Sequence, residues 1–242
     1  MYLPYTIPHA NNESWLVKTH GMEVPDLGIY ADKDWSDEKK SGAAMITRLD
    51  NYVGQITRKL QELGIEKNTM VIFSSDNGPH GEGGWNPNFF GSTADFRGMK
   101  RDLYEGGIRV PFIIKWPETI SPGEVDHVSA FWDFMPTACD VANVTSPQNI
   151  DGISFLPILL DKPQEQAHHE YLYWEFSVGA IEKQAVRKDS LICIRYRPKF
   201  KQEVIELYNV ERDNKEVNNI AEKHPKLVKE LTEIMNRYTE DN

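Results

Sequence analysis

An amphipathic stripe followed directly by a short apolar run is the feature that most constrains this fold. Between residues 37 and 63, apolar side chains recur every three or four positions, which predicts a helix: Ile46, Leu49, Val53, Ile56, Leu60 and Leu63. Gly64 stands where a helix C-cap belongs. The run at 69–74 then predicts a buried strand. A helix, a brief loop and a buried strand form half of a βαβ unit, so we expect an α/β fold.

The remaining chain divides near residue 160, where its composition changes. Before that point we expect a strand at 2–5, a long surface loop at 10–35, a strand at 108–117 and a helix at 131–143. A polar linker at 161–169 comes next. Short strands at 170–176, 184–188, 190–196 and 203–208 and an apolar helical stripe near 227–235 predict an antiparallel meander closed by a helix. We therefore predict a domain at 1–160 and a small α+β subdomain at 161–242.

Charge and composition exclude several classes of partner. The formal net charge of −10 argues against a nucleic-acid partner, which requires a basic surface. No apolar run approaches the roughly 18 residues of a membrane span. Two cysteines cannot make a disulfide framework, and both Cys139 and Cys193 lie in apolar patterns typical of buried thiols. The first residues lack the basic start and apolar core of a signal peptide.

Asp76 and Asn77 follow the run at 69–74 directly. In α/β sheets, ligands gather at the carboxyl ends of strands, so this position suits a binding residue. A carboxylate and an amide oxygen are hard donors that suit Ca²⁺ or Mg²⁺. The alternative is an Asx turn, and the tetrapeptide 75–78 taken alone favours that turn.

A basic segment at 97–109 is the second candidate site. Three cations within five residues, flanked by glycines, predict an oxyanion site, and the Lys100 ammonium suits a tetrahedral anion. A solvated basic turn paired with Asp102 and Glu105 is an equally good interpretation. His9 and His80 each stand beside a candidate loop and suit a donor or a general acid, although a lone histidine is more often structural.

Several strings in the chain together resemble the type I, arylsulfatase-like sulfatases, whose fold is alkaline-phosphatase-like. The strings are YTIPHA at 5–10, VIFSSDNGPH at 71–80, RGMKRDLYEGGIRVP at 97–111, WDFMPT at 132–137, DGISFLP at 151–157 and LYNV at 207–210. The resemblance implies that Asp76 and Asn77 are two ligands of a metal, usually Ca²⁺ with Mg²⁺ as the alternative. It implies that Lys100 binds the sulfate group and that His9 contacts sulfate and protonates the leaving oxygen. His80 lies in a family string, and we expect it to contact substrate.

The chain also departs from the family pattern. Sulfatases use a formylglycine made within a Cys/Ser-x-Pro-x-Arg motif, and no Cys or Ser here has proline two positions on. The family's Asp-Asp metal ligands and its Lys-x-His pair are missing as well. We therefore expect this chain to correspond to the C-terminal part of a sulfatase, with an incomplete mixed sheet and no activity on its own. The exposed apolar edge of that sheet would favour dimerisation or binding of a partner that carries the N-terminal half.

The function that the resemblance implies is hydrolysis of a sulfuric ester, on a sulfated carbohydrate or an aryl sulfate. The alternatives are a phosphatase or phosphodiesterase of the same superfold and a non-catalytic remnant that binds sulfated glycans. The string around Lys100 favours sulfate. A location like that of bacterial family members would be periplasmic or secreted.

Overall fold

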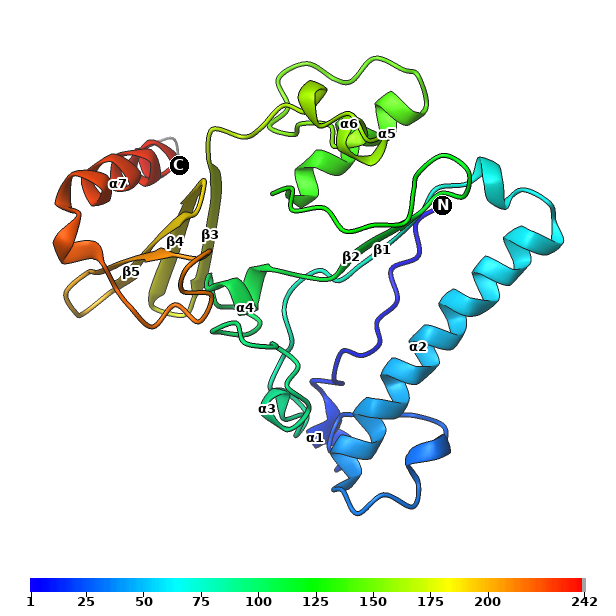
Figure 1. Ribbon diagram of the computed structural model, residues 1–242. Helices are drawn as coiled ribbons and strands as arrows, with labels where there is room; N and C mark the ends of the chain where they lie inside the picture. Colours follow the sequence, from blue (N-terminus) through cyan, green and yellow to red (C-terminus); the bar gives the residue numbers. More distant parts are fainter. Residues whose placement is uncertain (241–242) are drawn as a thin grey trace. The chain divides into compact units, whose positions relative to one another are not determined.

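The computed structural model describes residues 1–240, and its longest element is helix α2 (Asp37–Glu62) (Figure 1). The helix ends as the sequence predicts. Gly64 adopts a left-handed conformation with φ of 66°. The Ile65 N–H donates to the Leu60 carbonyl and the Gly64 N–H to the Gln61 carbonyl, at 3.0 and 2.9 Å. These two bonds form a Schellman motif, which satisfies carbonyls that the helix leaves unpaired.

The chain forms two compact units, the first comprising Met1–Glu66 and Phe73–Phe112. Besides α2, this unit contains short helical segments: α1 (Ser14–Val17), η1 (Gly28–Tyr30), α3 (Pro87–Phe90) and α4 (Glu105–Ile108). A small apolar core joins the N-terminal segment to α2 and the loop before α3, with Ala10, Met22, Met45 and Trp85 buried together. The loop expected at 10–35 is therefore largely irregular but interrupted by two short helical turns.

Strands β1 (Val71–Ser74) and β2 (Phe112–Lys115) form a two-stranded sheet. The 3₁₀ turn η2 (Glu66–Asn68) precedes β1. β1 confirms the strand predicted at 69–74, but its side chains are half-buried rather than buried. The strand predicted at 108–117 is shorter, because its first residue still belongs to α4 and Pro111 has no N–H for a ladder.

The strand predicted at 2–5 was wrong. Residues 1–6 have no regular structure, and within residues 1–240 the β1–β2 sheet contains no third strand with which they could pair. Tyr2 and Leu3 are exposed. A short apolar segment forms a strand only when a neighbouring strand supplies its hydrogen bonds.

The second unit comprises Lys67–Ile72 and the chain from Ile113 onward. Its helical segments are η3 (Phe131–Asp133), α5 (Phe134–Val141), α6 (Leu156–Leu159), η4 (Pro163–Glu165), η5 (Ala221–Lys223) and α7 (Pro225–Glu240). Its strands are β3 (Leu172–Val178), β4 (Ile181–Lys188), β5 (Leu191–Pro198) and β6 (Val204–Asn209). The strands pair in the antiparallel order β3-β4-β5-β6, which confirms the predicted meander. The predicted domain boundary at residue 160 stays a prediction.

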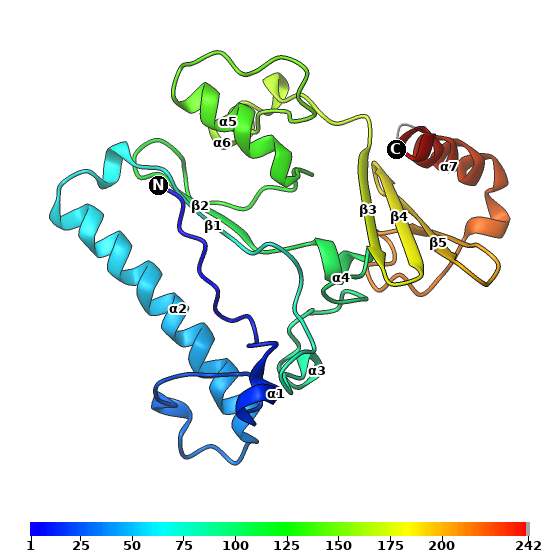
Figure 2. The ribbon, with the colours of Figure 1, turned by 180° about the vertical axis from the view of Figure 1, so that it is seen from behind.

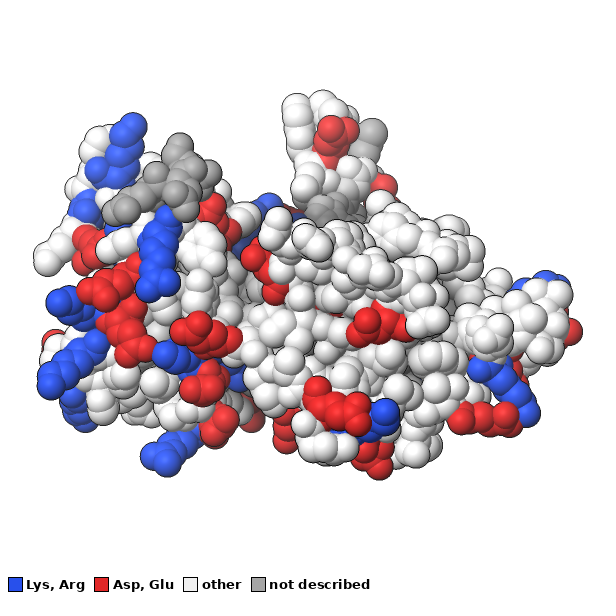
Figure 3. Space-filling view, turned by 90° about the horizontal axis from the view of Figure 1, so that it is seen from above, with Lys and Arg blue, Asp and Glu red and all other residues white. Residues whose placement is uncertain are grey.

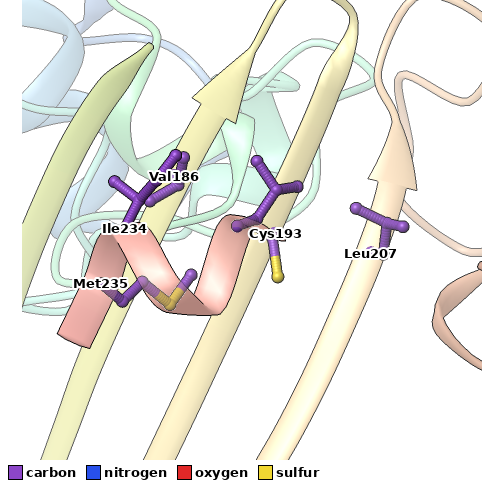
Figure 4. Close-up of a cluster of buried hydrophobic side chains, with 6 residues drawn as sticks. Val186, Cys193, Leu207, Ile234 and Met235 are labelled. Carbon is purple, nitrogen blue, oxygen red and sulfur yellow. The ribbon is translucent and has the colours of Figure 1, made fainter. Parts of the chain in front are cut away.

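Helix α7 packs on one face of this sheet, along β4 and β5 (Figures 1 and 2). Val186 pairs with Cys193, and Cys193 pairs with Leu207, so these three side chains form a row across the strands. Leu231, Ile234 and Met235 of α7 are buried in the same cluster as this row. Figure 4 shows Ile234 and Met235 beside it. Cys193 is buried, as predicted, and burial raises the pKa of its thiol to about 12. Cys139 is only half-buried, so the prediction of a buried thiol was wrong there.

A buried carboxylate holds the segment around α5 together. Asp133, which is 1% exposed, accepts hydrogen bonds from the Ala130 N–H, the Ile153 N–H and His169 Nε2 at 2.7, 2.8 and 2.8 Å. His169 lies in a polar stretch of sequence, yet its side chain is only 12% exposed and meets this carboxylate. A buried carboxylate needs such donors, and the polar sequence around His169 does not reveal this distant partner.

Charged residues of both signs intermingle on the face shown in Figure 3, in keeping with the net charge of −10. Within residues 1–240, none of the helices combines the length and the apolarity that spanning a membrane requires.

Candidate functional site

Lys100 lies in a tight turn that precedes α4 in the first unit. The Asp102 N–H donates to the Met99 carbonyl at 2.8 Å, and the Asp102 carboxylate accepts from the Met99 N–H at 3.2 Å. The Lys100 N–H donates to the Pro79 carbonyl at 2.8 Å. The backbone therefore ties Lys100 to the loop that follows β1, which is where the sequence placed the other candidates.

The Lys100 ammonium bridges His9 and a carboxylate. It donates to His9 Nε2 at 2.8 Å and to Glu82 Oε2 at 3.1 Å. The side chain of Lys100 is 15% exposed, so it is largely enclosed but reachable. An ammonium has three N–H groups, so two are used here and a third can meet a ligand.

The partners of His9 define its tautomer. His9 Nδ1 lies 2.6 Å from the Ala10 carbonyl, which can only accept, so Nδ1 carries the proton. His9 Nε2 faces the Lys100 ammonium, which can only donate, so Nε2 is the acceptor. His9 is therefore a neutral Nδ1–H imidazole in this arrangement.

Glu82 is the residue that the sequence analysis missed. Its carboxylate lies 2.6 Å from Arg101 Nη2, 3.1 Å from Lys100 Nζ and 3.8 Å from His9 Nε2. Burial raises the pKa of the Glu82 carboxyl, but hydrogen bonds from Lys100 and Arg101 outweigh it and bring that pKa below its usual range.

The sequence offered Asp102 and Glu105 as partners of the basic segment. Glu105 does pair with a cation of that segment, Arg109, whereas the carboxylate that pairs with Lys100 is that of Glu82. Asp102 supports the turn, and Glu105, which is 1% exposed, pairs with Arg109 at 3.3 Å. Arg109 also lies over the Phe96 ring at 4.7 Å. These contacts support a structural role for Arg109. The only signal for Glu82 in the sequence was a need for some counter-charge, and a glutamate in a glycine-rich loop is ordinary on a surface.

His80 connects two segments of the site through its ring. Nε2 lies 3.2 Å from the Pro8 carbonyl, and Nδ1 accepts the Glu82 N–H at 3.1 Å. A carbonyl only accepts and an N–H only donates, so His80 is the Nε2–H tautomer. Its ring stacks on that of His9 with centroids 5.9 Å apart. Both nitrogens have backbone partners, so the geometry favours a positioning role over the expected contact with substrate, which stays a prediction.

Asp76 and Asn77 follow β1 as predicted, but their side chains contact each other. Asn77 Nδ2 donates to Asp76 Oδ1 at 3.0 Å. Within the described part of the chain they do not hydrogen-bond to Lys100 or His9. The backbone instead links this pair to Lys100, because the Pro79 carbonyl, two residues after Asn77, accepts a hydrogen bond from the Lys100 N–H.

A close backbone approach fixes the loop that carries this pair. The Gly78 N–H donates to the Gly107 carbonyl at 2.9 Å, and a Cβ at Gly78 would overlap the Gly106 carbonyl. Only glycine fits at position 78. The turn after β1 therefore lies against the segment that leads from Lys100 into α4.

Asp76 and Asn77 offer the right type of ligand atom for Ca²⁺ or Mg²⁺, but too few of them. The hydrogen bond between the side chains leaves Asp76 Oδ2 and Asn77 Oδ1 as hard oxygen donors, whereas Ca²⁺ takes six to eight. Among residues 1–240, no group of three or more His, Cys, Asp or Glu side chains is placed to hold a metal ion. The prediction that Asp76 and Asn77 bind a metal stays a prediction.

Comparison with known proteins places the whole arrangement in context. The family described as "Sulfatase" matches residues 15–144, and the family described as "N-sulphoglucosamine sulphohydrolase, C-terminal" matches residues 97–241. Steryl-sulfatase of Rattus norvegicus is 35% identical over 151 residues, which are 60% of this chain and 26% of the rat protein. N-acetylgalactosamine-6-sulfatase of Mus musculus is 39% identical over 144 residues, which are 57% of this chain and 27% of the mouse protein.

The solved structure of Ps i-CgsB is similar in fold. It superposes with a TM-score of 0.80 and 23% identity, covering 100% of this chain and 50% of that one. The chain thus spans about a quarter of the two curated relatives and half of the solved chain. The fold class is a mixed α/β fold of the alkaline-phosphatase-like type, followed by a small antiparallel sheet with a helix, as predicted.

Proposed function

This chain belongs to the sulfatase family, and from that premise we propose that it supplies the sulfate-binding part of a sulfuric ester hydrolase. The single observation that supports this most is the meeting of Lys100 and His9 at 2.8 Å from segments 91 residues apart. A contact between segments so distant in sequence supports a binding site at Lys100 over a solvated basic turn.

Lys100 is proposed to bind the sulfuryl oxygens. Its ammonium is fixed by His9 and Glu82 before any ligand arrives, so a sulfate group meets a donor that needs little reorganisation. A third N–H of Lys100 suits an oxygen of a tetrahedral anion.

His9 is proposed to contact the sulfate group and to transfer the proton to the leaving oxygen. The nitrogen that faces Lys100 is Nε2, which is an acceptor in the neutral ring. To act as an acid, His9 must carry a proton at Nε2, so Nε2 would have to exchange its contact with the Lys100 ammonium for a contact with the leaving oxygen.

Asp76 and Asn77 are proposed to contribute two ligands to a Ca²⁺ or Mg²⁺ ion. When bound, such an ion neutralises negative charge on the sulfuryl oxygens. The two side chains would give up their mutual hydrogen bond and turn their oxygens to the ion. The remaining ligands must come from groups outside this pair.

Turnover also requires a nucleophile. Family members use a formylglycine, and this chain has no Cys/Ser-x-Pro-x-Arg motif. We therefore expect residues 1–242 alone to bind a sulfate ester without hydrolysing it. An aryl sulfate and a sulfated sugar remain equal candidates for the substrate class.

The test is binding of phenyl sulfate to the purified chain by calorimetry. Lys100→Ala should weaken binding about tenfold or more, because a charge-assisted hydrogen bond contributes roughly 1.5–3 kcal/mol. Lys59→Ala is the matched control, since Lys59 is exposed and pairs with Glu62 on α2. Equal affinities of the Lys100 variant and the parent would refute the proposed site.

A further inference from the structure

Glu82 places a negative charge inside a site that otherwise has two cations. One carboxylate contacts both the Lys100 ammonium and the Arg101 guanidinium, at 3.1 and 2.6 Å, and is 20% exposed. The neutral tautomer of His9 adds no charge. The group formed by Lys100, Arg101 and Glu82 therefore has a single net positive charge.

The net charge of this group distinguishes sulfate from phosphate monoesters, which have nearly the same shape but different charges. A sulfate monoester carries one negative charge, whereas a phosphate monoester carries two above its second pKa of about 6. An anion oxygen bound to Lys100 at an ordinary hydrogen-bond distance would lie within about 6 Å of the Glu82 carboxylate. A second negative charge on the ligand is repelled at that distance, most strongly where water is partly excluded.

We propose that Glu82 is a specificity-determining residue, whose carboxylate makes the site prefer a singly charged sulfate monoester over a doubly charged phosphate monoester. The inference rests on the proposed function, because it assumes that the anion binds at Lys100. It assigns to Glu82 a role in selecting the ligand besides that of orienting the two cations.

The experiment compares phenyl sulfate with phenyl phosphate, two ligands of nearly equal size that differ in charge. Their affinities for the whole chain are measured by calorimetry at pH 8 with a chelator present, so that metal ions do not add charge. Glu82→Gln keeps the side-chain size and an acceptor oxygen but removes the charge. The preference for phenyl sulfate should fall about tenfold in this variant.

Two further variants separate charge from shape. Glu82→Asp keeps the carboxylate and should retain the preference, although with weaker contacts. Glu62→Gln removes an exposed carboxylate that pairs with Lys59 on α2, and so changes the net charge of the protein equally. It should leave the ratio of the two affinities unchanged.

A second measurement needs no variant. At pH 5 phenyl phosphate carries about one charge, so the unmodified chain should lose most of its preference there. Glu82 stays ionised at that pH, because its pKa is lowered. This arm also covers the case in which Glu82→Gln does not fold.

Failure of this inference is distinguishable from failure of the proposed function. Suppose that Lys100→Ala weakens the binding of both ligands, but that Glu82→Gln and the lower pH leave the ratio of the two affinities unchanged. The role assigned to Glu82 is then overturned, and the anion site stands. If Lys100→Ala does not weaken phenyl sulfate, the site itself is wrong, and the inference is overturned with it.

Discussion

At the scale of single residues, two histidines of the same site have opposite tautomers. His9 keeps its proton on Nδ1 and His80 keeps its proton on Nε2, because each ring meets one partner that can only accept and one that can only donate. The two rings stack, yet only His9 faces the ammonium of Lys100. The sequence could propose both as donors or acids but could not divide the roles between them.

The tautomers are open to direct measurement. We expect the ¹⁵N spectrum of the imidazole side chains at pH 8 to show His9 as the Nδ1–H form and His80 as the Nε2–H form. His80→Ala should lower the free energy of unfolding by about 1–3 kcal/mol, because the Glu82 N–H and the Pro8 carbonyl lose their partner. His224→Ala, at an exposed position, is the control. An Nδ1–H spectrum for His80 would contradict the positioning role.

At the scale of elements, the C-terminal sheet and α7 follow from pattern alone. The centres of β4 and β5 are buried on successive residues, and on one face of the sheet the row Val186, Cys193 and Leu207 meets the apolar stripe of α7. Short apolar runs predict the strands, and an apolar stripe of period 3.6 predicts the helix that covers them.

That core gives a stability prediction. Leu207→Ala should lower the free energy of unfolding by about 2–5 kcal/mol, since it removes a fully buried side chain beneath α7. Urea unfolding followed by circular dichroism measures this. Val217→Ala, at an exposed irregular position, should change stability by about 0.5 kcal/mol or less. Similar losses in the two variants would show that α7 does not cover the sheet.

The segment around α5 gives a pH prediction. Burial lowers the pKa of His127 from its ordinary 6.5, and repulsion from His168 adds to this, although Asp133 acts in the opposite direction. The unfolded chain therefore binds this proton more readily than the folded chain, so stability rises with pH across the window below 6.5. His127→Gln should make the loss of stability between pH 7 and pH 5 shallower in urea titrations. A steeper loss would reverse the sign, and His224→Gln is the control.

At the scale of the whole molecule, large apolar side chains remain exposed on several elements. On η3 and α5 these are Phe131, Phe134 and Met135, and on β2 they are Phe112 and Ile113. Clusters of this kind on a soluble surface favour association. The dimer expected from the sequence stays a prediction.

Sedimentation velocity across a range of protein concentrations tests whether the chain forms a dimer. We expect the unmodified chain to sediment faster as its concentration rises. Phe134→Ser combined with Met135→Ser should reduce that dependence, because it removes exposed apolar area from one helix. Phe200→Ser, on the turn between β5 and β6, removes an isolated exposed ring and should have a smaller effect. A single concentration-independent species would refute the prediction.

The sequence by itself determined the elements whose signals are local. Helix α2 with its C-cap at Gly64, the four-stranded meander and α7 follow from periodicity and turn chemistry, which act over a few residues. The strings around His9, Asp76 and Lys100 likewise marked the family. A local pattern could not show that residues 1–6 lack a strand partner.

Only the tertiary structure decided which groups meet. Glu82 rather than Asp102 pairs with Lys100. His80 hydrogen-bonds to the Pro8 carbonyl, and His169 pairs with the buried Asp133. The pairings of His80 and His169 join segments that are distant in sequence, and Glu82 and Lys100 lie closer together along the chain. Which acid neutralises a cation, and which ring nitrogen keeps its proton, depends on distances of about 3 Å that are set only when those segments pack.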